Sequence, residues 1–344
     1  MPQRALITGI SGFAGGFLAE QLLHCGDLVL GCSPDGSWTA ASPESIRPRV
    51  ELAAWDLSVP GDVPGAVRRR IEQFRPEAIY HLAAVSTPRD CGDEEPTPQA
   101  VALNVGGTRR VLELAGALAW RPRVVLVSSS HVYAPVTRES YRVAEDAPLA
   151  PRGAYGRTKL AAEEEVRRAV REQGCDAVIA RAFRHAGPRQ IAPLMLPEWS
   201  RQFAQGGPEP VRVQTCDAYV DLSDVRDVVR AYRLLAQRGR RGEVYNVGSG
   251  VSRRSGHILE LMRGMADPAR PVVELQPGFK QDPIADVTRL VRATGWTPEI
   301  PLEQTVADTL AWWREKGSGF GVHGSGSGRE GSGFGVQGSG GTSR

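Results

Sequence analysis

The sequence has no long hydrophobic run and no leader-like beginning. No apolar stretch reaches about 18 residues, the length that a membrane-spanning helix requires. The opening MPQRALITGISG leads directly into a strand-like segment and lacks the apolar centre and cleavage site of a secretory signal. We therefore expect a cytoplasmic protein that has no membrane partner.

Cysteine pairs and metal-ligand clusters are also missing. The cysteines are odd in number and scattered, and none of them form a CxxC pair. They are Cys25, Cys32, Cys91, Cys175 and Cys216. This usage is typical of reduced thiols, and no His/Cys cluster has the spacing of a metal site. We predict no metal and no disulfide framework.

The sequence has no large excess of charge of either sign. The chain has 42 Lys and Arg against 39 Asp and Glu, a formal net charge of +3, and no basic block. This balance does not favour nucleic acid as a partner. Hydrophobic residues make up 41% of the chain, which is enough for a sizeable core.

Short apolar runs alternate with amphipathic stretches through the first two thirds of the chain. We expect strands at 4–9, 28–33, 49–57, 78–84, 123–130 and 176–183, and helices at 15–26, 63–76, 99–119 and 155–172. Such alternation indicates a parallel sheet covered on both faces. The predicted fold class is α/β, with a doubly wound parallel sheet.

The composition changes after Phe183, where Pro and Gly become frequent. A long helix capped by Ser223 or Asp224 and helices at 255–265 and 305–316 are expected. We predict a cofactor domain at 1–183, to which segments near 211–247 return, and a smaller mixed α/β substrate domain at 184–316. Residues 317–344 are Gly/Ser-rich and contain a near-repeat, so a disordered tail is expected there.

A glycine-rich turn, GISGFAG at residues 9–15, follows the first predicted strand. Glycines at this spacing allow a tight turn and let the backbone approach a pyrophosphate, which the N-terminus of the next helix then holds. A structural turn is the alternative, but its place between the first strand and the first helix favours a Rossmann-type NAD(P) site. The contacting residues would be Gly9, Gly12, Phe13, Ala14 and Gly15.

The end of the second strand decides between NAD and NADP. An acid there binds the ribose 2′-hydroxyl of NAD and repels the 2′-phosphate of NADP. The expected position holds Ser33, with Asp35 two residues later. We therefore favour NADP(H), and Asp35 keeps NAD(H) possible. The other residues expected along the cofactor groove are Asp56, Leu57, Ala83 and Ala84.

The segment GAYGRTKLAAEEE places Tyr155 four residues before Lys159, on one face of a predicted helix. Alone, such a pair is usually a surface feature. The fifth strand, however, ends in the hydroxyls of SSSHVY, at the sheet edge where open α/β folds bind ligands. Ser129, Tyr155 and Lys159 are thus expected to converge beside a nicotinamide.

The combination of TGxxGFxG, HLAA, SSxxVY and YxxxK resembles the extended short-chain dehydrogenase/reductase superfamily, in its nucleotide-sugar epimerase/dehydratase branch. The stretches NVGSG, DVRDVVRAY, HAGPRQ and GWTPEIPLEQTVADTLAWW resemble GDP-6-deoxy-D-mannose reductases (GDP-4-keto-6-deoxy-D-mannose reductases). The resemblance covers residues 4–316. It implies an NAD(P)-dependent oxidoreductase that acts on a nucleotide sugar and forms a homodimer.

The resemblance also implies the role of each catalytic residue. Tyr155 is the general acid that protonates a sugar carbonyl oxygen as hydride arrives. Lys159 hydrogen-bonds the nicotinamide ribose and lowers the pKa of the tyrosine from about 10 toward the working pH. Ser129 holds and polarises the same carbonyl oxygen.

The reaction type depends on the residues after the catalytic serine. Sugar 4,6-dehydratases of this family carry an acid pair there, where this chain has Ser130 and His131. Serine is not an acid near neutral pH, and one histidine does not replace two acids. We therefore expect reduction of the 4-keto group of a nucleotide-linked 4-keto-6-deoxy sugar. An epimerase or dehydratase, and a catalytically silent cofactor-binding regulator, remain as alternatives.

The substrate side departs from the family pattern. Members have Asn in FNHxGP, where this chain has Arg184 before His185, and the Arg-Arg-Asp run that clamps the diphosphate is missing before Asp221. Because valine does not replace a bidentate arginine, another cation would have to bind the anion. The candidate substrate residues are Ser130, His131, Arg184, His185, Arg189 and Lys280.

Overall fold

Seven parallel strands form the central sheet of the computed structural model, which describes residues 2–39 and 42–317. The strand order is β11-β7-β5-β4-β1-β2-β3. The strands are β1 (Arg4–Thr8), β2 (Leu28–Ser33), β3 (Glu51–Ala54), β4 (Ala78–His81), β5 (Arg123–Ser129), β7 (Ala177–Ala182) and β11 (Val244–Val247). The order reverses between β1 and β4, as in a doubly wound sheet, so the predicted fold class is confirmed. Apart from Gly317, the predicted tail lies outside the described residues.

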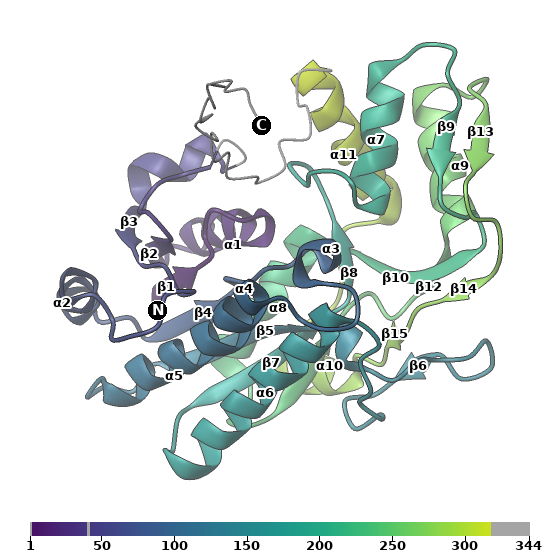
Figure 1. Ribbon diagram of the computed structural model, residues 1–344. Helices are drawn as coiled ribbons and strands as arrows, with labels where there is room; N and C mark the ends of the chain where they lie inside the picture. Colours follow the sequence, from purple (N-terminus) through teal and green to yellow (C-terminus); the bar gives the residue numbers. More distant parts are fainter. Residues whose placement is uncertain (1, 40–41, 318–344) are drawn as a thin grey trace, which may run out of the picture.

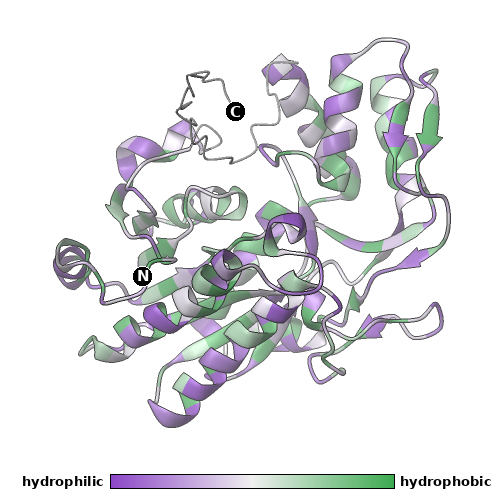
Figure 2. Cartoon of the chain, in the orientation of Figure 1, coloured by the Kyte–Doolittle hydropathy of each residue, from purple (hydrophilic) through white to green (hydrophobic). Residues whose placement is uncertain are grey.

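Helices cover both faces of the sheet (Figure 1). One face carries α1 (Phe13–His24), α8 (Val225–Arg238) and α10 (Thr288–Thr294), and the other carries α2 (Gly65–Phe74), α5 (Thr108–Ala117) and α6 (Ala154–Glu172). Successive strand residues therefore enter different cores: Val125 packs with α1 and α8, and Leu126 packs with α5 and α6. Figure 2 shows hydrophobic residues gathered in the strands and on the helix sides that face them.

Segments that follow Phe183 in the chain return to the central sheet and complete it. Helix α8 packs against α1, and β11 pairs with β7 from Val244 opposite Ile179 to Val247 opposite Ala182. Strands β9 (Val211–Val213) and β10 (Ala218–Asp224) instead join small sheets of the other lobe. Of the stretch near 211–247, α8 and β11 thus lie with the central sheet, while the division into domains stays a prediction.

The smaller lobe packs three helices against short strands. The helices are α7 (Met195–Gln205), α9 (Ser255–Ala266) and α11 (Leu302–Lys316), and they share a core that includes Trp199, Met262 and Val306. The strands are β8 (Arg184–Ala186), β10, β12 (Ser252–Arg254) and β14 (Lys280–Gln281) in one sheet, β9 with β13 (Val272–Glu274), and β6 (Arg142–Val143) with β15 (Ile284–Ala285).

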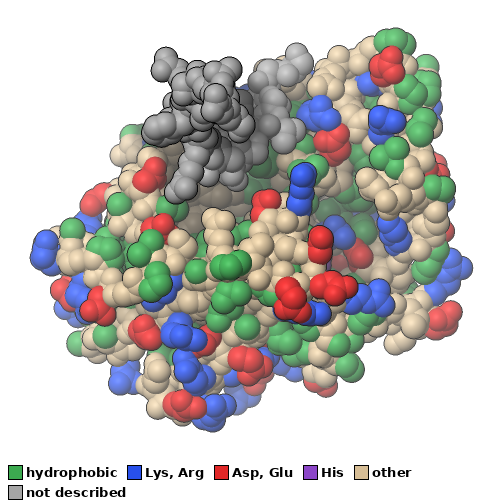
Figure 3. All heavy atoms as spheres, in the orientation of Figure 1, with side chains coloured by type: hydrophobic (Ala, Val, Ile, Leu, Met, Phe, Trp, Pro, Cys, Tyr) green, Lys and Arg blue, Asp and Glu red, His purple; other side chains and the backbone are tan. Residues whose placement is uncertain are grey.

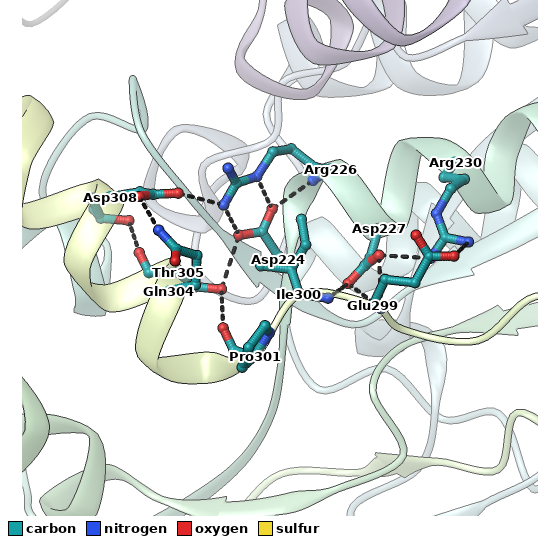
Figure 4. A network of polar contacts seen from close by, with 11 residues as sticks. Asp224, Arg226, Asp227, Arg230, Glu299, Ile300, Pro301, Gln304, Thr305 and Asp308 are labelled. Carbon is teal, nitrogen blue, oxygen red and sulfur yellow. Dashed lines mark hydrogen bonds and ion pairs between the residues drawn. The ribbon is translucent and has the colours of Figure 1, made fainter. Parts of the chain in front are cut away.

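Charged contacts at the start of α8 tie the two lobes together (Figure 4). Asp224, one of the two predicted capping residues, accepts from the Arg226 N–H at 2.8 Å and from Thr305 Oγ1 of α11 at 2.9 Å. Asp227 accepts from the N–H of Glu299 at 3.0 Å. A helix of the central sheet is thereby fixed to the last helix of the smaller lobe.

The helix expected at 99–119 is not regular. It consists of α4 (Pro98–Ala100), a π-helical segment η2 (Val101–Gly107) and α5. The wide turn lets the buried Asn104 amide bridge the loop after β4 and helix α6, because it accepts from Val85 N and donates to Val85 O and to Thr158 Oγ1 at 2.8, 3.1 and 3.0 Å. Such π segments are frequent near functional sites. The remaining short helices are η1 (Glu44–Arg49), α3 (Pro88–Cys91) and η3 (Ser130–Val132).

Membrane, metal and disulfide features were searched within residues 2–39 and 42–317. No helix there is long and apolar enough to cross a membrane. No three His, Cys, Asp or Glu side chains in these ranges are grouped as metal ligands would be. The five cysteines, all in the described part of the chain, are free thiols.

Candidate active site

The carboxyl ends of the central strands open into one cavity of about 950 Å³, which reaches α7 of the smaller lobe. Figure 3 shows this face hollowed between the two lobes. The predicted site residues that line the cavity are Gly9, Gly12, Phe13, Ala14, Gly15, Ser33, Asp56, Leu57, Ala83, Ala84, Ser129, Ser130, His131, Tyr155, Lys159, Arg184, His185 and Arg189. Lys280 lies outside it, exposed and donating to Gln276 Oε1 at 3.4 Å.

The turn between β1 and α1 has no room for side chains. A Cβ on Gly15 would lie 2.2 Å from the Gly9 carbonyl oxygen, and a Cβ on Gly9, whose φ is +74°, would lie 2.6 Å from Ala83 N. Helix α1 begins at Phe13 without a side-chain cap, so the N–H groups of its first turn remain for a ligand. This cradle fits a pyrophosphate.

The end of β2 presents a polar group without a partner. Ser33 is buried and lines the cavity, and within the described chain its hydroxyl has no hydrogen-bond partner. Asp35 is not part of the lining; its carboxylate accepts from Ser37 N and Oγ at 3.0 and 2.7 Å, which holds the pKa of Asp35 below its usual value. Because buried hydroxyls are normally bonded, the unpaired Ser33 fits the ribose end of a dinucleotide.

The proposed catalytic residues meet where β5 ends beside the first turns of α6. Ser129 Oγ lies 3.1 Å from His131 Nδ1. The rings of His131 and Tyr155 pack edge to face with centroids 5.5 Å apart. Lys159 Nζ donates to Val127 O at 2.9 Å and lies 5.9 Å from the centre of the Tyr155 ring.

Desolvation controls the protonation of this cluster. It raises the pKa of Tyr155 to about 12, although a hydrogen bond with Ser129 acts in the opposite direction. It lowers the pKa of Lys159 to about 8, against the opposing influence of Cys91 and Glu163. Near pH 7 the phenol therefore carries its proton and the lysine is mostly an ammonium. The direction for Tyr155 is opposite to the expected one, because burial disfavours the phenolate more than its neighbours favour it.

His131 presents a largely neutral imidazole to the cavity. Desolvation and the nearby Arg184 guanidinium lower its pKa, while Asp282 acts to raise it. A neutral ring beside Ser129 is able to accept a proton, which gives this cluster a second acid–base group besides Tyr155.

A smaller pocket of about 340 Å³ adjoins the catalytic residues. It shares Ser130, His131, Tyr155 and Arg184 with the large cavity. At this junction Arg184 Nε donates to Asp282 Oδ2 at 2.5 Å. The open space beside Tyr155 therefore continues from the large cavity into the smaller pocket.

Strand β8 and the segment that follows it are fastened to α1. Arg189 donates to both oxygens of Glu20 at 2.9 and 2.6 Å, and its guanidinium lies 3.7 Å from the centre of the Phe17 ring. The ring of His185 stacks on Phe13 with centroids 6.1 Å apart. Arg189 lines the cavity, but its charge is already engaged by Glu20.

Several residues that line the cavity were not predicted from the sequence. Gln190 Oε1 and Tyr232 OH are buried polar atoms of lining residues without a partner among the described residues. Gln190 ends the HAGPRQ stretch and was open to prediction from that motif. The other lining residues not predicted include Thr39, Trp55, Leu194, Met195, Leu196 and Pro197, several of which come from the smaller lobe.

The chain is similar to known proteins over most of its length. The family described as NAD dependent epimerase/dehydratase matches residues 5–248. A GDP-6-deoxy-D-mannose reductase of Pseudomonas aeruginosa is 29% identical over 325 residues, covering 92% of this chain and 99% of the relative. A dTDP-glucose 4,6-dehydratase of Streptomyces griseus is 28% identical over 336 residues, covering 92% and 95%. The structure of RMD from Pseudomonas aeruginosa complexed with NADPH is similar with a TM-score of 0.72 and 26% identity, covering 91% and 99%. The chain belongs to the NAD dependent epimerase/dehydratase family of extended short-chain dehydrogenases/reductases.

Proposed function

We propose that this protein uses NADPH to reduce the 4-keto group of a nucleotide-linked 4-keto-6-deoxy sugar, to a product of the GDP-6-deoxy-D-mannose type. The observation that carries the proposal is that Ser129, Tyr155 and Lys159 lie in the same cavity as the glycine cradle. Similarity to a GDP-6-deoxy-D-mannose reductase, and to a structure that holds NADPH, supports it.

The cavity residues divide between the two ends of the cofactor. Gly9 and Gly15 leave room for the pyrophosphate, Ser33 would meet the adenosine ribose, and Lys159 would bind the nicotinamide ribose. When bound, NADPH supplies a hydride to the sugar carbon.

The protein supplies the proton and the polarisation. Ser129 Oγ would donate to the C4 carbonyl oxygen and draw charge onto it. Tyr155, which is protonated at working pH because desolvation raises its pKa to about 12, would then transfer its hydroxyl proton to that oxygen. The ketone becomes a hydroxyl, Tyr155 is left as a phenolate, and the ammonium of Lys159 offsets the negative charge of that phenolate.

Arg184 is our candidate for an anionic group of the substrate. It lines both the large cavity and the smaller pocket, next to the catalytic residues. Arg184 is bonded to Asp282 through its Nε, whereas Arg189 donates to Glu20 from both terminal nitrogens, so Arg189 is the weaker candidate. Lys280 is the weakest candidate, since it lines neither space.

Epimerisation or dehydration is the second candidate function. It is favoured by one observation: the largely neutral His131 imidazole lies 3.1 Å from Ser129 Oγ and is able to accept a proton near the sugar. The similarity to a dTDP-glucose 4,6-dehydratase supports it as well.

Incubation with NADPH and GDP-4-keto-6-deoxy-mannose separates these possibilities. Net oxidation of NADPH, with a 6-deoxy sugar nucleotide formed in equal amount, is the expected result. Conversion of GDP-mannose or a UDP-sugar without net change of the cofactor would establish the second candidate. Binding of both ligands without turnover would indicate a silent cofactor-binding regulator.

Ser33→Asp is expected to shift the cofactor preference from NADPH toward NADH. A carboxylate at the end of β2 binds the ribose hydroxyls and repels a 2′-phosphate, so the ratio of kcat/KM for NADPH over NADH should fall about tenfold or more. Asp35→Asn is the matched control, because the Asp35 carboxylate is bonded to Ser37 away from the cavity lining. An unchanged ratio in Ser33→Asp would show that the ribose lies elsewhere.

A further inference from the structure

Helix α6 carries a third functional group on the face of its catalytic residues. Tyr155, Lys159 and Glu163 follow one another at intervals of four, so their side chains share one side of the helix. Glu163 is fully buried, with 0% of its surface exposed, although it is a carboxylate. Acids are almost never fully buried unless they are paired. The partners of Glu163 must therefore compensate for the free energy of desolvating its carboxylate.

The Glu163 carboxylate accepts four hydrogen bonds. Oε1 accepts from Ser128 Oγ at 2.6 Å and from Arg181 Nε at 2.9 Å. Oε2 accepts from Arg181 Nη2 and from Arg167 Nη2, each at 2.8 Å. All of its acceptor positions are therefore used, and the group is fixed in both position and rotation.

Two of these donors stand on the strands beneath α6. Ser128 of β5 and Arg181 of β7 are directly opposite each other in the parallel pairing. Ser128 immediately precedes Ser129, the residue proposed to hold the substrate carbonyl. One carboxylate thus joins the helix of Tyr155 and Lys159 to the strand end of Ser129.

Arg181 is itself held from the far side. It is 1% exposed, and its Nη1 donates to Tyr133 OH at 3.0 Å and to Glu145 O at 2.9 Å. Tyr133 OH donates onward to Asn246 Oδ1 of β11 at 2.6 Å. The guanidinium therefore has little freedom to follow a displaced helix.

We propose that Glu163 is a positioning residue of the active site, which fixes α6 against β5 and β7 and holds the Lys159 ammonium in place beside Ser129. This inference goes beyond the proposed reaction and rests on the roles that the proposal gives to Tyr155 and Lys159. The position of Glu163 also has an electrostatic consequence, which is open to direct measurement.

The electrostatic consequence concerns the groups that face Lys159. They are Tyr155 and Glu163 of its own helix, Cys91 of α3 and His81 of β4. Desolvation favours the neutral amine, and Glu163 opposes it with a full negative charge one helical turn away. Removal of this charge should therefore lower the pKa of Lys159 further and leave much of it neutral near pH 7.

The chain is well suited to a direct measurement, because it contains three lysines, Lys159, Lys280 and Lys316. In protein labelled with ¹³C at lysine Cε, the NMR titration of the buried Lys159 is followed without cofactor or substrate, and the two exposed lysines serve as internal references. Loss of one signal in Lys159→Met assigns it. Glu163→Gln is expected to move the Lys159 midpoint down by about 1 pH unit or more from its wild-type position.

Glu164→Gln is the matched control, since it makes the same change one residue away on a side chain that is 64% exposed; it should leave the Lys159 midpoint where it was. If Glu163→Gln does not fold, Glu163→Met/Arg181→Met removes both buried charges together, a change that other proteins tolerate. Because the local net charge then stays the same, this variant tests positioning, and its kcat should fall. Ser128→Ala keeps the charge but removes one anchor, so it should lower kcat without moving the Lys159 titration.

An unmoved Lys159 midpoint in folded Glu163→Gln, or an unchanged kcat in Ser128→Ala or in the double variant, would overturn the inference. The titration is independent of turnover, so the two ideas fail separately. Wild-type protein that reduces no nucleotide sugar, yet shows the expected shift in Glu163→Gln, would reject the proposed reaction and keep the role of Glu163. Active protein with an unmoved midpoint would do the reverse.

Discussion

Replacement of Tyr155 by Phe is expected to lower the turnover of a 4-keto sugar nucleotide by about 100-fold or more, the usual contribution of a general acid. The variant loses one oxygen atom and keeps the ring that packs against His131. NADPH affinity should therefore survive. Steady-state rates, together with NADPH binding followed by fluorescence, check both halves of this expectation.

Tyr219→Phe is the matched control for this experiment. Tyr219 lies on β10 against Phe279 and lines neither the cavity nor the smaller pocket, so its hydroxyl should be dispensable. Near wild-type turnover in Tyr155→Phe would mean that another group delivers the proton, and His131 would then be the first residue to replace.

Lys159→Met should weaken NADPH binding by about 10- to 100-fold, the value of a charged hydrogen bond of about 1.5–3 kcal/mol. The turnover should fall as well, because no ammonium remains to offset charge on Tyr155. Lys280→Met serves as the control: it removes the same charge at an exposed position outside the cavity. Equal effects in the two variants would contradict the proposed role of Lys159.

The wild-type protein should show the matching pH dependence. Desolvation lowers the pKa of Lys159 to about 8, so the ammonium is present below that pH and is lost as the pH rises through it. Activity that needs the ammonium should therefore decline above about pH 8. A decline that persists unchanged in Lys159→Met would belong to a different group.

The sheet and the phosphate turn were open to prediction because their signals are local. Buried parallel strands appear in the sequence as short apolar runs. The turn at residues 9–15 is recognised by its glycines, which stand where a Cβ would clash with the backbone. The convergence of Ser129 with Tyr155 followed from the rule that ligands bind at the carboxyl ends of such strands.

The properties that the sequence did not reveal depend on distant partners. The pKa of Tyr155 is raised because the surrounding protein desolvates its hydroxyl, and the spacing of residues along a helix does not predict that desolvation. Arg189 looked like a free cation, yet Glu20 pairs with it from a helix far earlier in the chain. Glu163 stands in a run of three acids in the sequence, and the reason for its burial appears once Arg181 is placed on the neighbouring strand.

The crossing of the chain between the two lobes has a consequence for how the protein is made. The face of the sheet that packs against α1 is also covered by Val228 of α8 and by Trp296. The edge strand β11, which contains Val247, completes the sheet beside β7. All three residues come later in the chain than the start of the smaller lobe. A nascent chain that has emerged only to Phe183 would leave Tyr80 and Val178 exposed to water. The face of the sheet that α8 covers therefore has its full core only once β11 has been synthesised, and we expect the cofactor groove to form late in synthesis.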